Sequence, residues 1–395
     1  MNPSKTRLLG LDGGASKVRG WEIRPTSKGF DLEGTPIENK YQDHSKYLKD
    51  FSPVDLNRQL SEKAYGKIDP QKNEIEYGQV ITETIANTIL DLVAKRTGKW
   101  VIGIGFPGLK TRDKRGISAM ANGPRMPNLA SNIENILDHE KIDLNDRIHQ
   151  LGSDADFCGL GENEGNGGHF KNIDNAYYIG SGTGVADALK LHGQLVPFDQ
   201  IQDWLGKSWE MEMNGFPIES LLSVRGIQEQ YSIVTGIHIN ELSKNGLYAQ
   251  QILEKAQNND QQAKETLAET GKNLGKLFFE RIETIACGWQ KRFNFINPER
   301  NDLITEHDYL GTCLDRGIIG QRLGVLLHRD IGSRIIWQEL ENTLSLMVAN
   351  TDHLPETFKS NFKPKTFFRI SNLRDAPALG AGISAWKIFM KKNNA

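Results

Sequence analysis

The first hundred residues combine two short apolar stretches with one long helical face. Residues 8–11 are mostly apolar and run into Asp-Gly-Gly, and an extended pattern resumes after Lys17, which together predict a β-hairpin. Across residues 77–93, apolar side chains recur at three- and four-residue spacing, which predicts a helix facing the core. Residues 100–105 form a predicted buried strand. The glycine-rich loop 103–108 follows at the carboxyl end of this strand, which is where open α/β sheets bind ligands. A plain loop is the alternative.

The chain between and after these elements is less regular. Residues 29–76 are polar, charged and rich in turn residues, so we interpret them as an insertion or a lid in which Ser52 caps a helix. Ser131 is expected to cap a short amphipathic helix. Residues 159–168 are rich in glycine, and we predict a mobile loop there.

A second strand, turn and strand occupy residues 177–191, with Gly-Ser-Gly-Thr-Gly at 180–184 as the turn. Two such hairpins, about 170 residues apart, indicate two similar halves that each offer a phosphate-binding turn to a shared cleft. The pattern then becomes helical, at residues 217–230, 240–257 and 260–293. Gly271 and Gly275 lie inside the last helix, where each costs about 1 kcal/mol relative to Ala. We therefore expect close packing or a ligand beside them.

Composition narrows the function classes. The chain has 395 residues, of which 38% are hydrophobic and 25% charged, as in an ordinary soluble protein with two domains of roughly 150–200 residues. A net charge of −2 gives no basic surface for nucleic acid or an anionic membrane. No apolar run is long enough to span a bilayer, and the first strand begins near Arg7, which leaves no room for a signal peptide. We expect a cytoplasmic protein with neither nucleic-acid nor membrane partners.

The three cysteines are Cys158, Cys287 and Cys313, and they are far apart in the sequence. They form no C-x-x-C pair, so neither a zinc site nor an iron–sulfur cluster is predicted. So sparse a set in a long chain is typical of a reducing compartment.

The first turn carries residues that can bind phosphate. Glycines let the backbone approach a ligand closely, and backbone N–H groups can form an anion-binding nest together with a hydroxyl and an ammonium group. The candidates are Asp12, Gly13, Gly14, Ser16 and Lys17. The carboxylate of Asp12 follows a strand and could hold Mg²⁺ through water. A simple tight β-turn is the alternative, because Asp-Gly is a common hairpin signal.

A third candidate position is Asp154. It follows a predicted strand near residues 147–151 and precedes a helix start, where a carboxylate is favourable. A catalytic carboxylate and a simple helix N-cap both fit this position.

These motifs together resemble the ROK family of repressors, open reading frames and sugar kinases, within the actin-like ATPase superfamily. The resemblance rests on residues 11–17, 103–108, 153–156, 161–162, 182–184, 193–197, 297–299 and 379–381 and on Gly311, which follow one another in the family's order. Residues 193–197 are similar to those of polyphosphate glucokinases, a branch of this family.

The resemblance implies an α/β protein with the two-lobed, ribonuclease-H-like fold of actin-like ATPases, with mixed β-sheets and a cleft between the lobes. The N-terminal lobe would comprise residues 1–153, with 380–395 packing back on it, and the C-terminal lobe residues 154–379. The resemblance implies ATP, Mg²⁺ and a sugar as ligands, and it is compatible with a homodimer. The family's cysteine-rich zinc motif is missing from this sequence, so no zinc is predicted.

The same resemblance assigns roles by position. Asp154 would be the catalytic base, and Asp12 would hold Mg²⁺ through water. The phosphate- and nucleotide-binding residues would be Asp12, Gly13, Gly14, Ser16, Lys17, Gly182, Thr183, Gly184 and Gly311. The sugar-binding residues would be Asn122, Ser153, Asp154, Glu210 and Glu219.

Three functions are compatible with these motifs. A glucokinase-like sugar kinase needs two phosphate turns, a metal-holding carboxylate and one base. A repressor of the same family would need a DNA-binding segment before the first strand, where about seven residues stand. The remaining alternative is a non-catalytic sensor that binds sugar and nucleotide. The kinase is the prediction that we take forward.

Overall fold

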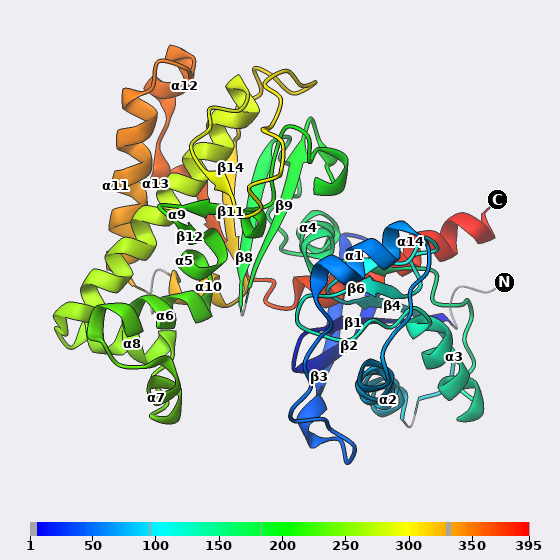
Figure 1. The fold of residues 1–395 in the computed structure, drawn as a ribbon. Helices are drawn as coiled ribbons and strands as arrows, with labels where there is room; N and C mark the ends of the chain where they lie inside the picture. Colours follow the sequence, from blue (N-terminus) through cyan, green and yellow to red (C-terminus); the bar gives the residue numbers. More distant parts are fainter. Residues whose placement is uncertain (1–5, 95, 183, 329–332, 395) are drawn as a thin grey trace. The chain divides into compact units, whose positions relative to one another are not determined.

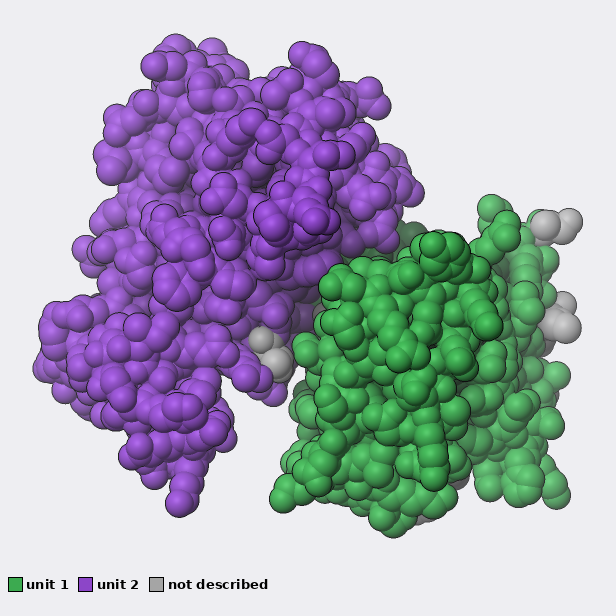
Figure 2. Space-filling view, viewed as in Figure 1, with its two compact units in different colours: residues 1–166, 375–395 green, residues 167–374 purple. Residues whose placement is uncertain are grey.

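The computed structural model describes residues 6–94, 96–182, 184–328 and 333–394, which form two compact units (Figure 1). The first unit consists of Met1–Asn166 and Asp375–Ala395, and the second of Gly167–Arg374. Figure 2 shows the units in separate colours.

The first unit is built on a five-stranded mixed sheet of order β3-β2-β1-β4-β7. Its strands are β1 (Thr6–Gly13), β2 (Lys17–Thr26), β3 (Gly29–Lys40), β4 (Lys99–Gly105) and β7 (Leu151–Gly152). The predicted hairpin is confirmed, since β1 and β2 pair antiparallel. On the other side of β1, β4 and then β7 run parallel to it.

The second unit repeats this arrangement in a sheet of order β10-β9-β8-β14-β15. Its strands are β8 (Ala176–Ser181), β9 (Val185–Leu191), β10 (Gln194–Leu195), β14 (Arg316–Gly320) and β15 (Phe368–Ile370). Again a central hairpin is antiparallel and the next two strands run parallel to its first strand. The prediction of two similar halves is therefore confirmed by strand order and direction.

Helices cover the first sheet (Figure 1). They are α1 (Leu56–Ala64), α2 (Lys72–Val93), α3 (Leu129–His139), α4 (Asp154–Glu164) and α14 (Ala376–Asn393), and a small hairpin joins β5 (Leu109–Lys110) to β6 (Ile117–Ala119). Because side chains alternate along a strand, Leu9 and Leu11 of β1 pack in the core cluster that includes α2, while Gly10 faces α14.

The helix α14 lies flush against the central strands because those strands carry glycine where it crosses. A Cβ atom at Gly10 would lie 1.9 Å from the carbonyl oxygen of Ala378, and one at Gly103 would lie 1.9 Å from that of Ala381. The helix α4 packs along α14. It therefore lies in the first unit, whereas the sequence-based boundary at residue 153 assigned it to the other lobe.

The interpretation of residues 29–76 as an insertion or lid is wrong at both ends of this range, which belong to β3 and to α2. Residues 29–40 form β3, which pairs with β2 along its length. The strand lies at the edge of the sheet and none of its twelve residues is buried, so its composition is that of a loop. The helix that follows is capped by Asp55, whose carboxylate accepts a hydrogen bond from the N–H of Arg58, and not by Ser52.

Two local predictions in the same unit are also corrected. The helix α3 begins after Asn128, three residues earlier than the predicted cap at Ser131. The predicted mobile loop at 159–168 is helical as far as Glu164. Gly161 is needed there for close packing, because a Cβ atom at this position would lie 2.6 Å from the carbonyl oxygen of Ala376.

The second unit is mainly helical outside its sheet. Its helices are α5 (Ile218–Leu222), α6 (Val224–Thr235), α7 (Ile239–Lys244), α8 (Ala249–Gln257), α9 (Gln261–Cys287), α10 (Gln321–Leu326), α11 (Arg334–Asn350), α12 (Glu356–Asn361) and α13 (Pro364–Phe367), and a short sheet joins β11 (Met211–Met213), β12 (Phe216–Pro217) and β13 (Asn294–Phe295). The predicted helix at 217–230 is divided at Ser223, whose hydroxyl caps α6. None of the described helices is both long and apolar enough to cross a bilayer.

The two glycines inside α9 are explained by close packing on α11. A Cβ atom at Gly271 would lie 2.5 Å from the carbonyl oxygen of Ile336, and one at Gly275 would lie 2.9 Å from Cβ of Thr343. We expect Gly271→Ala to lower the free energy of unfolding by about 2 kcal/mol, because overpacking outweighs the gain in helix propensity.

Chemical denaturation of the intact chain measures this change. Glu265→Ala, at an exposed position of the same helix, is the control and should change stability by less than about 0.5 kcal/mol. A Gly271→Ala variant as stable as the parent would show that α9 and α11 do not pack this closely.

Candidate functional site

Three parallel strands of the first unit end at one edge of the sheet. In the strand register Asp12 of β1 lies beside Gly105 of β4, and Gly105 lies beside Gly152 of β7. With about 4.8 Å between neighbouring strands, Asp12 and Gly152 are roughly 10 Å apart. The loops that leave these ends carry the first turn, the glycine-rich loop 106–108 and Ser153–Asp154. The fold therefore gathers three of the sequence motifs at the edge where ligands bind in open α/β sheets.

The two glycines of the first turn have different reasons to be glycine. A Cβ atom at Gly13 would lie 2.4 Å from Cδ2 of Phe106, so this position is required for packing against the loop after β4. At Gly14 the nearest atom to an added Cβ would be the carbonyl oxygen of Lys17, at 3.7 Å. Gly14 therefore has the open surroundings expected of a ligand contact.

A buried tyrosine holds this turn. The N–H of Tyr41 donates to the carbonyl oxygen of Ser16 at 3.0 Å, and its hydroxyl donates to that of Gly14 at 3.1 Å. Burial, followed by the charges of Tyr77 and Asp12, raises the pKa of Tyr41 well above its usual range. The hydroxyl therefore stays protonated and keeps the turn in one conformation.

Lys17 already has an anionic partner. Its Nζ lies 2.6 Å from Oε2 of Glu38 on β3, and both side chains are about one-third exposed. The hydrogen bond from Lys17 and its positive charge outweigh partial burial and lower the pKa of Glu38, so this carboxylate is charged at neutral pH. Ser16 is exposed at the tip of the turn. A phosphate group would have to share Lys17 with Glu38.

Asp12 is half-buried at the end of β1 and stands directly opposite Arg19 in the antiparallel register. Arg19 in turn lies 3.3 Å from the carboxylate of Asp375, the residue before α14. No group of three or more His, Cys, Asp and Glu side chains that could hold a metal occurs among the described residues. Mg²⁺ needs only one or two carboxylates beside water and substrate phosphates, so the half-buried carboxylate of Asp12 fits that ion.

The helix α4 begins with Asp154 and is capped by the residue before it. The hydroxyl of Ser153 accepts a hydrogen bond from the N–H of Asp156 at 3.1 Å and donates to the carboxylate of Asp156 at 2.8 Å. The side chain of Asp154 lies outside the described residues. Its backbone position nevertheless contradicts the N-cap alternative, because Ser153 occupies that position and Asp154 is the first helical residue.

Asn122 is exposed in a turn that follows β6. This turn lies next to the loop leaving β4, since a Cβ atom at Gly108 would lie 2.7 Å from the carbonyl oxygen of Ala119. The structure thus places the predicted sugar-binding Asn122 in the same unit as Asp154, beside one of the loops of the ligand-binding edge.

The turn in the second unit follows β8 in the same way. The N–H of Val224, the first residue of α6, donates to the carbonyl oxygen of Gly182 at 3.1 Å and to Oγ of Ser181 at 3.0 Å. Nothing lies within 4 Å of a Cβ atom added at Gly182. Thr183 lies outside the described residues. An open glycine beside a helix N-terminus is a favourable environment for an anion.

Glu219 lies against this turn. Its Oε2 accepts a hydrogen bond from the N–H of Val185 at 3.2 Å and would be 2.5 Å from a Cβ atom at Gly184. Gly184 is therefore glycine to make room for the carboxylate. The predicted sugar-binding role of Glu219 stays a prediction, and the contact that the structure shows is support of the turn.

Glu210 is engaged elsewhere. Its carboxylate forms an ion pair with Arg300 and accepts a hydrogen bond from the N–H of Lys207 at 3.3 Å. These contacts join the segment before β11 to the segment after β13. A sugar would have to compete with Arg300 for this carboxylate.

The structure does not bring Gly311 to the phosphate turn. Gly311 has a φ of +83°, and the next residue, Thr312, lies 2.9 Å from Nε2 of His192. His192 follows β9, whereas the turn precedes β9, and a strand of this length spans about 20 Å. The positive φ is a sufficient reason for glycine at this position, and its predicted contact with the nucleoside stays a prediction.

Sequence reasoning missed Gln321, which does lie beside the turn. Gly320 pairs with Gly180, and Gln321 bridges to Ser181. Gln321 has a φ of +55°, a conformation that residues other than glycine rarely adopt. The signal in the sequence was the apolar run that ends at Gly320. The residues Tyr41 and Asp375 were missed as well, and no local pattern marks them.

Comparisons with known proteins give structural matches only. No family model and no curated protein matches this sequence. A ROK family glucokinase from Streptomyces griseus, solved with glucose and AMPPNP, matches at a TM-score of 0.60 and 12% identity over 96% of this chain and 99% of its own. A ROK hexokinase from Thermus thermophilus matches at a TM-score of 0.56 and 13% identity, over 98% of this chain and 100% of its own.

A ROK family transcriptional regulator, a homolog of the E. coli MLC protein, matches at a TM-score of 0.53 and 11% identity, over 98% of this chain and 80% of its own. At such identities a match shows the fold, and kinases and a regulator share it. The chain therefore has the α/β fold of the ROK sugar kinases, an actin-like ATPase fold, as the motifs indicated.

Proposed function

We propose that this protein transfers a phosphoryl group from ATP to a hydroxyl group of a hexose or a related sugar. The observation that carries the proposal is the gathering of Asp12, the open Gly14 and the first residue of α4 at one sheet edge. Phosphoryl transfer depends mainly on positioning and charge stabilisation, so phosphate-binding turns and two carboxylates are sufficient.

Asp154 is the residue that we assign as general base. It accepts the proton of the sugar hydroxyl while that oxygen forms a bond to the γ-phosphorus and the bond to the bridging oxygen breaks, which releases ADP. Asp12 would hold Mg²⁺ through water, and the metal would neutralise charge on the phosphates. We assign the turn at 180–184 of the second unit to phosphate binding as well.

A non-catalytic sensor for sugar and nucleotide is the alternative. One observation favours it: Lys17 is paired with Glu38, and Glu210 with Arg300, so two predicted ligand contacts are occupied within the protein. A regulator with the same fold is consistent with this alternative.

A coupled assay of ADP release, run over hexoses and N-acetylhexosamines, separates the two functions. We expect ADP release that depends on one sugar, with polyphosphate in place of ATP as the control for the donor. Sugar and ATP binding by calorimetry without ADP release would establish the sensor and contradict the kinase.

A further inference from the structure

The segment between β3 and α2 reaches the turn that carries Asn122. Gln59 of α1 is completely buried, and its amide Nε2 donates to the carbonyl oxygen of Met120 at 3.1 Å. Its Oε1 accepts from the N–H of Met120 at 2.8 Å. One side chain thus satisfies both backbone groups of a residue two positions before Asn122.

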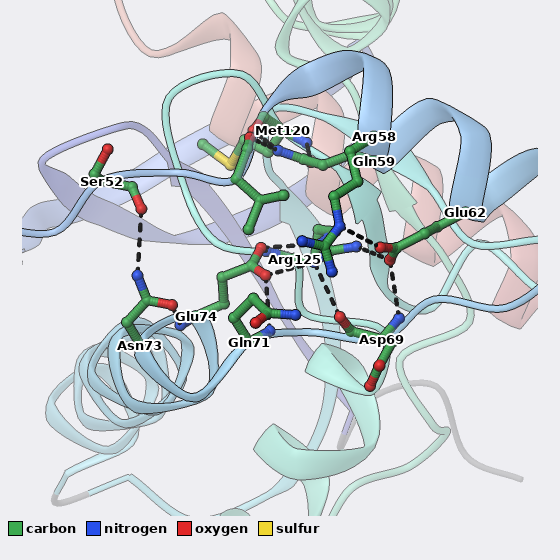
Figure 3. Close-up of polar contacts among 11 residues, drawn as sticks. Ser52, Arg58, Gln59, Glu62, Asp69, Gln71, Asn73, Glu74, Met120 and Arg125 are labelled. Carbon is green, nitrogen blue, oxygen red and sulfur yellow. Dashed lines mark hydrogen bonds and ion pairs between the residues drawn. The ribbon is translucent and has the colours of Figure 1, made fainter.

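The other side of the turn is fixed by a buried ion pair. Arg125 is fully buried, and its guanidinium donates to both carboxylate oxygens of Glu74, at 2.9 and 2.6 Å (Figure 3). The backbone N–H of Arg125 donates to the same carboxylate at 3.1 Å. Burial alone would raise the pKa of Glu74, but these bonds from Arg125 and the N–H of Gln71 hold it below its usual range.

The helix α1 belongs to both contacts. Glu62, one turn after Gln59, forms an ion pair with Arg125 and also accepts from Nε of Arg58 at 2.9 Å. These hydrogen bonds lower the pKa of Glu62 to about 2, and the bond from Arg58 has the largest effect. The network is therefore charged at neutral pH and ties α1 to α2 through the segment that carries Asn122.

The base of the turn is closed as well. Ile117 and Met126 exchange two backbone hydrogen bonds, at 2.9 and 3.0 Å, so residues 118–125 form a loop with Asn122 near its tip. Asn122 itself is exposed. The buried contacts described above hold the two flanks of the loop, at Met120 and Arg125, and Asn122 is exposed between them.

We propose that α1 is a specificity element of the proposed kinase, in which Gln59 is a positioning residue that holds Asn122 for contact with the sugar. The proposal rests on the proposed function and gives the segment between β3 and α2 a role. According to this proposal, the affinity for the sugar depends on the buried amide of Gln59, which itself contacts neither the sugar nor the nucleotide.

The test is Gln59→Met, which keeps the length of the side chain and removes both amide contacts with Met120. We expect the KM for the sugar to rise about tenfold, with the KM for ATP and the kcat at saturating sugar changed less than about twofold. Gln79→Met is the matched control, because Gln79 is exposed on α2 and bonds only with Glu83 among the contacts seen for its side chain. It should leave all three constants unchanged.

A double-mutant cycle shows whether Gln59 acts through Asn122. Asn122→Ala should raise the sugar KM, and adding Gln59→Met to it should raise the KM no further. Equal and additive effects would overturn the positioning role. Glu62→Gln, expected to act in the same direction with a smaller effect, keeps the test usable if Gln59→Met does not fold.

Hydrogen exchange distinguishes a failure of this proposal from a failure of the kinase function. Gln59→Met should speed amide exchange across residues 117–126 and leave the β1–β2 turn unchanged. If the parent phosphorylates a sugar and Gln59→Met alters neither sugar KM nor exchange, the proposal is wrong while the kinase stands. If the parent phosphorylates nothing, the kinase is wrong, and unchanged exchange would remove the role of Gln59 in holding the loop.

Discussion

Asp154→Asn is expected to lower kcat by about 10²–10⁴-fold, the usual contribution of a general base. The substitution keeps the shape of the side chain and removes its charge and basicity. Because Ser153 caps α4, Asp154→Asn should leave the free energy of unfolding nearly unchanged. Rapid-quench or coupled kinetics on the sugar found in the screen, together with thermal unfolding, measure both quantities.

Two neighbours are internal controls for this prediction. Ser153→Ala removes the cap and should cost about 1 kcal/mol of stability. Asp156→Asn, at the third helical position, should lower kcat far less than Asp154→Asn does. An Asp154→Asn variant that keeps more than about a tenth of the parent kcat would remove Asp154 from the mechanism.

Gly182→Val is expected to weaken nucleotide binding by about 5- to 150-fold without loss of stability. No atom lies within 4 Å of the new Cβ, so the side chain fits the folded protein but occupies the space that we assign to phosphate. The factor corresponds to the roughly 1–3 kcal/mol that overpacking costs. Titration calorimetry with ATP analogues gives the dissociation constant.

Variants at the two glycines of the first turn give a comparison for the same experiment. Gly14→Val should behave as Gly182→Val does, because its surroundings are also open. Gly13→Val should instead lower thermal stability, since its side chain meets Phe106. Unchanged nucleotide affinity in both Gly14→Val and Gly182→Val would show that these turns do not bind phosphate.

The features that the sequence predicted are those with local signals. Apolar runs that end in glycine and hydroxyl residues revealed both hairpins, and a helical apolar face revealed α2. Two hairpins of one kind then suggested the repeated sheet. The edge strand β3 was not predicted because none of its residues is buried, so its composition does not differ from that of a loop.

The contacts at the candidate site that the sequence did not predict have a different origin. The pairing of Lys17 with Glu38 depends on strand register across 21 positions, which no local pattern records. In the sequence, Gly311 and Gly182 are equally plausible as ligand contacts. The positive φ of Gly311 is a sufficient reason for glycine there. At Gly182, which follows a strand end, no neighbouring atom requires glycine, so packing does not explain it. Which glycine lies at a strand end is a property of the topology.

The glycine face of β1 and β4 also affects how the chain is made. Its covering helix α14 follows residues 167–374 in the sequence, so the ribosome must add about 200 residues between the two parts of the first unit. At roughly 5–20 residues per second, this takes on the order of 10–40 s. During that time Gly10 and Gly103 are uncovered, whereas the second unit is one continuous segment and can fold as soon as it emerges. The first unit would thus finish folding last, although its synthesis begins first.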